Sequence, residues 1–151
     1  MDAEAQLESF IAKFDPEVAE LGRAAFARLK RRIPGATTMV YDNFNALAIG
    51  FGAVEKPKQA VLSLVFYVPG RLSICFIWGK GLPDPHGLLQ GGGSQVRFVR
   101  LPTLDPLDDP RVDALIEAAI SRSEPPFDPQ AEQRLIIRSI SAKQRPRRAA
   151  P

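Results

Sequence analysis

AVLSLVFYV (residues 60–68) and RLSICFIW (residues 71–78) decide the fold, because both alternate in the period of two typical of β-strands. Two residues, Pro69 and Gly70, separate them, and so short a link predicts an antiparallel pair. The side chains expected in the core are Leu62, Leu64, Phe66, Val68, Leu72, Ile74, Phe76 and Trp78. Those expected to point away from it are Ser63, Tyr67, Ser73 and Cys75.

Further strands are expected on both sides of this pair. TTMVYD (37–42) and ALAIGF (46–51) precede it, QVRFVRL (95–101) follows it, and RLIIRSI (134–140) is a candidate for a short final strand. The short links between the first four strands favour an antiparallel meander.

Helices are expected before and after the strands. Apolar residues recur at i, i+3, i+4 and i+7 from Leu7 to Phe14, and Asp15-Pro16 starts a second helix that Pro34-Gly35 ends. Asp109-Pro110 begins a C-terminal helix in the same way. The sequence therefore predicts an α+β two-layer sandwich. In it, an N-terminal helical hairpin and a C-terminal helix pack on a five- to six-stranded, mainly antiparallel sheet.

Length and charge indicate one domain with a basic tail. The chain has 151 residues, of which 45% are hydrophobic and 25% charged, as expected of a globular domain over residues 1–140. Residues 141–151 contain Lys143, Arg145, Arg147 and Arg148 and no acid. We expect this segment to be disordered and to bind nucleic acid at most weakly, since four cations give little affinity at physiological salt.

The sequence favours a cytoplasmic protein without a membrane segment. Met1 to Glu4 are acidic where a secretory segment would be basic, and no apolar run approaches about eighteen residues. A single cysteine, Cys75, rules out an internal disulfide. One histidine and one cysteine are also too few for a structural zinc site, and no cofactor is expected.

A glycine-rich loop holds the chain's one histidine, His86. GLLQGGGS (87–94) nearly matches the phosphate-binding pattern G-x-x-x-x-G-K-S, but Gly93 occupies the lysine position and a strand follows where a helix is needed. No nucleophile pairs with His86 in the sequence, and apolar neighbours predict an inert Cys75 thiol. We expect this loop to be a hinged connection between two strands. For the chain as a whole, we expect a binding module in preference to an enzyme.

The predicted binding site is the open face of the sheet beneath this loop. Its candidate residues are Tyr41, Asn43, Asn45, Tyr67, His86, Arg97 and Arg100. Aromatic bodies with polar tips suit a small anionic or aromatic ligand, or a protein partner. An equally weighted alternative is that residues 42–45 (DNFN) form a tight turn and nothing more.

Three stretches carry a family resemblance: VYDNFNALAIGF (40–51), GLPDPHGLLQGGGSQVRFVRL (81–101) and SAKQRPRR (141–148). With them, the chain resembles the YdhG-like family of bacterial domains over most of residues 5–148. The resemblance implies a frataxin-like fold, and some family members are labelled iron chaperones. It therefore implies an alternative function, iron binding by acidic residues of the first helices: Glu4, Glu8, Glu17 and Glu20.

Overall fold

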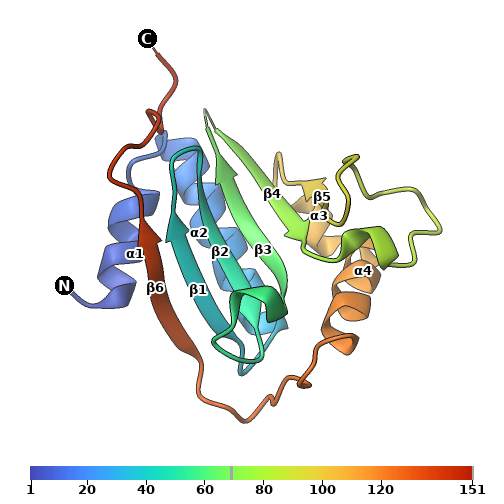
Figure 1. The fold of residues 1–151 in the computed structure, drawn as a ribbon. Helices are drawn as coiled ribbons and strands as arrows, with labels where there is room; N and C mark the ends of the chain where they lie inside the picture. Colours follow the sequence, from blue (N-terminus) through green and yellow to red (C-terminus); the bar gives the residue numbers. More distant parts are fainter. Residues whose placement is uncertain (69, 151) are drawn as a thin grey trace.

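The strands form one sheet in this computed structural model, which describes residues 1–68 and 70–150. Within these residues the sheet has six strands in the order β5-β4-β3-β2-β1-β6 (Figure 1). Their bounds are β1 Thr37–Asp42, β2 Ala46–Gly52, β3 Ala60–Tyr67, β4 Arg71–Phe76, β5 Arg97–Arg100 and β6 Arg134–Ile140. Neighbours pair antiparallel except β6, which joins β1 in parallel. The predicted, mainly antiparallel sheet is confirmed.

Two helices precede the strands and two lie between β5 and β6, and the predicted helices from residues 7, 15 and 109 are among them. They are α1 Ala3–Ile11, α2 Pro16–Arg32, α3 Asp105–Asp108 and α4 Pro110–Ser121, with short 3-10 turns η1 Pro57–Gln59 and η2 Gly79–Gly81. The carboxylate of Asp109 accepts a hydrogen bond from the Arg111 amide at 2.9 Å and so caps α4, with Pro110 at the first helical position. None of the described helices has both the length and the apolar character needed to cross a membrane.

One face of the sheet packs against the helices. Cross-strand pairing aligns Val40, Ile49, Leu64, Ile74 and Val99 in a single row, and all five are buried in the same core as the apolar side chains of α1, α2 and α4. The predicted core set is confirmed for β3 and β4. Trp78 is the exception, since it is 49% exposed where the chain leaves β4 and turns into η2.

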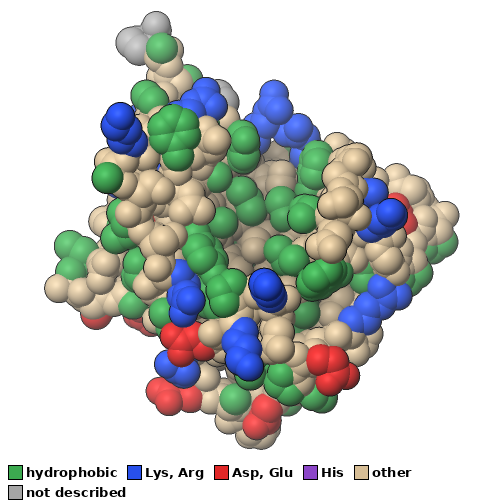
Figure 2. Space-filling model, viewed as in Figure 1, with side chains coloured by type: hydrophobic (Ala, Val, Ile, Leu, Met, Phe, Trp, Pro, Cys, Tyr) green, Lys and Arg blue, Asp and Glu red, His purple; other side chains and the backbone are tan. Residues whose placement is uncertain are grey.

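The opposite face of the sheet is turned away from α1 and α2, which lie behind the strands in Figure 1, and only the short turn η1 lies in front of its lower part. Its central positions carry small side chains: Ala46, Ala48, Gly50, Ser63 and Ser73. Figure 2 shows the result, a hollow in the middle of this face with larger side chains around it. We call this the open face.

Candidate functional site

Three of the predicted site residues lie on the open face but not together. Pairing from β1 to β5 places Tyr41 and Arg100 at opposite ends of one row across the sheet. Four strand spacings separate them, or about 19 Å at ~4.8 Å per strand. Tyr67 projects from β3 between them and is 48% exposed. The backbone positions of Tyr41 and Arg100 are therefore toward opposite sides of the open face.

Asn43 and Asn45 contact the C-terminal part of the chain. The Oδ1 atom of Asn43 accepts a hydrogen bond from the Ser139 hydroxyl at 3.0 Å. The Oδ1 atom of Asn45 accepts one from Arg145 at 3.4 Å. Both asparagines lie between β1 and β2, so the structure supports the turn alternative for these residues.

The glycine-rich loop lies beside the sheet. Gln90 and Phe98 exchange backbone hydrogen bonds of 2.9 Å, which folds the loop back along the outer edge of β5 (Figure 1). Arg97 pairs with Phe76, whose side chain faces the helices, and donates to the backbone carbonyls of Gly93 and Val96 at 2.6 and 2.8 Å. Arg97 therefore does not share the open face with Tyr41, and the loop lies at the edge of the sheet.

His86 is exposed at a distance from the open face. It lines a separate hollow of about 220 Å³ beside the start of α4, together with Pro110 and Arg111. The nearby Asp84 carboxylate accepts hydrogen bonds from the amides of Leu88 and Leu89 at 2.8 and 2.9 Å. Asp84 therefore shapes its own turn and does not orient the imidazole.

Cys75 has the environment of an unreactive thiol. Burial raises its pKa to about 11, so the thiolate is scarce at neutral pH. This agrees with the inert cysteine expected from its apolar neighbours in the sequence.

The acidic residues proposed for iron do not assemble. Glu4 lines a small hollow with Lys30 near the end of α2, whereas Glu17 and Glu20 lie in the first turns of that helix. Glu8 accepts two hydrogen bonds from Arg23, of 2.8 and 3.0 Å. Across the described residues, no three His, Cys, Asp or Glu side chains are grouped so that they could hold a metal ion. The iron alternative therefore lacks an assembled site.

The structure contains a groove at the ends of β4 and β5 that the sequence did not predict. Its volume is about 640 Å³, and it lies between the start of α2 and the segment that leaves β5. Its lining residues are Glu17, Val18, Leu21, Gly70, Arg71, Leu72, Arg100, Leu101, Pro102, Thr103 and Leu104. We call it the β4–β5 groove. Its lining is mainly apolar and also includes Arg71 and Arg100.

The two arginines of the β4–β5 groove have no acidic partner among the described residues. Arg71 and Arg100 project from adjacent strands on the same face, since Arg100 pairs with Ser73, two residues after Arg71. The guanidinium of Arg100 also lies 5.5 Å from the ring centre of Phe98, which favours one orientation. Their shared face is the open face, whereas Val18, Leu21 and Leu72 border the groove from the helix side. The period of two in RLSICFIW implies the face of Arg71, but the packing of α2 could not be predicted from the sequence.

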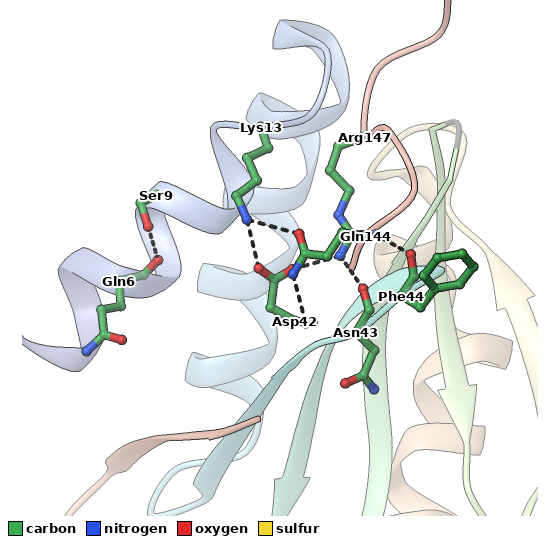
Figure 3. Close-up of polar contacts among 8 residues, drawn as sticks. All are labelled: Gln6, Ser9, Lys13, Asp42, Asn43, Phe44, Gln144 and Arg147. Carbon is green, nitrogen blue, oxygen red and sulfur yellow. Dashed lines mark hydrogen bonds and ion pairs between the residues drawn. The ribbon is translucent and has the colours of Figure 1, made fainter. Parts of the chain in front are cut away.

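A buried ionic network lies on the helix side of the sheet (Figure 3). Asp42 is fully buried, and its carboxylate contacts Lys13 Nζ at 2.9 Å and Arg147 Nη2 at 2.8 Å. Arg147 is itself 4% exposed and donates to the backbone carbonyls of Asn43 and Phe44. This corrects the prediction of a disordered tail, because Arg147 anchors the segment after residue 140 to the core.

The Asp42 carboxylate is held as an anion. Burial acts to raise its pKa, but hydrogen bonds from Lys13, Gln144 and Arg147 outweigh burial, so the net pKa lies below the ordinary value. An aspartate stabilised in this way is a weak base, and both of its carboxylate oxygens already accept hydrogen bonds from Lys13 or Arg147. The network therefore stabilises the fold and does not provide acid–base chemistry.

The depressed pKa of Asp42 predicts a pH-dependent contribution to stability. The unfolded chain binds a proton at this carboxyl more readily than the folded chain, so unfolding becomes easier as the pH falls. The stability advantage of the wild type over Asp42→Asn should be complete above about pH 5 and should shrink below it. Urea unfolding of both proteins between pH 2.5 and 7 measures this difference. A difference that does not vary with pH would contradict the prediction.

Comparison with known proteins adds no assignment to this geometry. No family model, curated protein or solved structure matches the chain.

Proposed function

We propose that this chain is a binding module that holds a small ligand with an anionic head group and an apolar body in the β4–β5 groove. The observation that carries the proposal is that Arg71 and Arg100 are among the lining residues of a largely apolar groove and have no acidic partner among the described residues. A volume of about 640 Å³ is in the range of small-molecule sites.

The chemistry of the lining selects the ligand class. A guanidinium group presents a planar fork of N–H donors that matches a carboxylate or a phosphate. Val18, Leu21 and Leu101 offer a surface for an aliphatic or aromatic body, whose burial contributes roughly 25 cal/mol per Å². Glu17 at the same groove disfavours a second negative charge near α2. We therefore expect a ligand with one anionic head group.

The proposals on family, enzymatic activity and cellular location rest on the family resemblance and on the composition. We propose that the chain is a YdhG-like domain without enzymatic activity. We also propose a cytoplasmic location, for which the single Cys75 is the supporting feature.

Decanoate provides a direct probe of the β4–β5 groove. It should bind at least about tenfold more tightly than decan-1-ol, which lacks the charge, and more tightly than butyrate, which lacks most of the chain. Isothermal titration calorimetry measures all three. The double variant Arg71→Gln/Arg100→Gln should weaken decanoate binding about 10- to 100-fold while leaving decan-1-ol unchanged.

A matched control is Arg111→Gln, which removes an exposed arginine in the first turn of α4, outside the groove. It should bind decanoate like the wild type. If decanoate gives no saturable heat, or if the double variant binds it like the wild type, the groove is not the anion site.

A further inference from the structure

Two exposed aromatic side chains lie at one end of the sheet. Phe44, between β1 and β2, is 50% exposed, and Tyr67, at the end of β3, is 48% exposed. The two chain segments are adjacent, because the amide of Val68 donates to the carbonyl of Asn45 at 3.2 Å and Tyr67 pairs with Ala46. Figure 3 shows the ring of Phe44 directed away from the Asp42 network. This end of the sheet therefore offers two accessible rings.

Arginines flank these rings on both sides. Arg71 is the direct cross-strand neighbour of Tyr67. Arg145 lies beside Phe44, since its amide donates to the Phe44 carbonyl at 2.9 Å. The buried Arg147 fixes Arg145 there, two residues along the chain. We call Phe44, Tyr67, Arg71 and Arg145 the aromatic–arginine surface.

On the open face, the charged strand positions near the aromatic–arginine surface are of one sign, whereas Glu17 of α2 borders the β4–β5 groove. The strand positions on the open face include Arg71 and Arg100 but no Asp or Glu, since Asp42 points into the core. Figure 2 shows Lys and Arg side chains, and no acidic ones, along the upper margin of the hollow. The acidic side chains in that view lie mainly toward the lower margin. The complementary partner is a polyanion.

We infer that the aromatic–arginine surface binds single-stranded nucleic acid. Bases stack on Phe44 and Tyr67, and phosphates contact Arg71 and Arg145. Aromatic rings interleaved with cations on an open sheet provide both interactions that a single strand needs, because every base has a π-face and every linkage carries one charge. An acidic peptide would satisfy the arginines but would leave both rings without a stacking partner. This inference does not depend on the ligand of the β4–β5 groove.

Fluorescence anisotropy with a labelled twelve-nucleotide oligouridylate tests the inference. Binding is expected at 50 mM salt and should weaken as salt increases. Phe44→Ala and Tyr67→Ala should each weaken binding about fivefold or more, because each removes a stacking ring. Arg145→Ala should reduce the slope of log affinity against log salt by about 0.7, the value for one phosphate contact. Arg111→Ala, a distant exposed arginine, should change neither quantity.

Three outcomes would overturn the inference. The first is the absence of binding at 50 mM salt. The second is wild-type affinity in both Phe44→Ala and Tyr67→Ala, which would mean that charge alone attracts the strand. The third is competition by polyglutamate as effective as competition by unlabelled oligouridylate, which would assign the surface to an acidic polypeptide.

Two measurements on the same proteins keep the result interpretable. Circular dichroism and thermal unfolding establish that each variant folds, which is expected because Phe44 and Tyr67 are about half exposed. Decanoate titration of Phe44→Ala and Arg145→Ala should match the wild type, because neither residue lines the β4–β5 groove. Failure of nucleic-acid binding and failure of the proposed small-ligand function are thus observed separately.

Discussion

Replacing Arg147 by alanine should lower the free energy of unfolding by about 3 kcal/mol, the lower end of the range for breaking a buried ion pair. Asp42 is fully buried, and Arg147 satisfies one of its oxygens from a distance of 2.8 Å. The expected loss of stability lies at the lower end of that range because Lys13 still contacts the other carboxylate oxygen of Asp42 at 2.9 Å. Urea unfolding followed by circular dichroism should show a lower midpoint with an unchanged slope.

Arg148→Ala is the matched control for this prediction. Arg148 is the next residue, is exposed, and donates to the backbone carbonyls of Lys13 and Ala12 at 3.2 and 3.3 Å. Its removal should change the free energy of unfolding by about 0.5 kcal/mol or less. The double variant Asp42→Asn/Arg147→Ala should lose less stability than the sum of the two single variants, because the unpaired buried charge is gone. Equal losses in Arg147→Ala and Arg148→Ala would contradict this account.

The basic tail shows what composition cannot reveal. Four cations without an acid after residue 140 indicate a solvated segment when they are read locally. The partner of Arg147 is Asp42, which lies 105 residues earlier in the chain. A signal was nevertheless present, because Thr38, Val40 and Asp42 continue one face of β1 into the core. A carboxylate at a core position requires a cation from elsewhere.

The order of helices and strands was predictable because it depends on local periodicity. Strand alternation over residues 60–76 and the Asp-Pro helix starts at residues 15 and 109 all appear in the structure. The position of β6 in the sheet depends on contacts with β1, which is far from it in the sequence. A long connection separates it from α4, and its parallel pairing with β1 comes from packing across the sheet.

The structure does not bring all the candidate site residues together, partly for a reason that strand geometry could have supplied. Arg97 and Arg100 are three positions apart on one strand, and side chains an odd number of positions apart point to opposite faces. The two residues therefore could not both line the open face once β5 was recognised. The β4–β5 groove required knowledge of how α2 packs, because Val18 and Leu21 approach Leu101 only in the folded chain.

Gly22→Ala should destabilise the protein by about 1–3 kcal/mol, although alanine normally stabilises a helix relative to glycine. Gly22 lies inside α2, and a Cβ atom there would overlap the ring of Phe66. Phe66 is fully buried and packs against Phe14 with 5.3 Å between the ring centres. The ring therefore has no free space into which to move, and the overlap outweighs the gain in helix propensity.

A second substitution separates this steric effect from other causes. In Gly22→Ala/Phe66→Leu the smaller side chain relieves the overlap, so the double variant should be more stable than the sum of the single changes predicts. Thermal unfolding of the four proteins gives the coupling free energy directly. An increase in melting temperature for Gly22→Ala alone would mean that α2 can move away from β3. In that case the contact between Gly22 and Phe66 would not set the distance between the helix layer and the sheet.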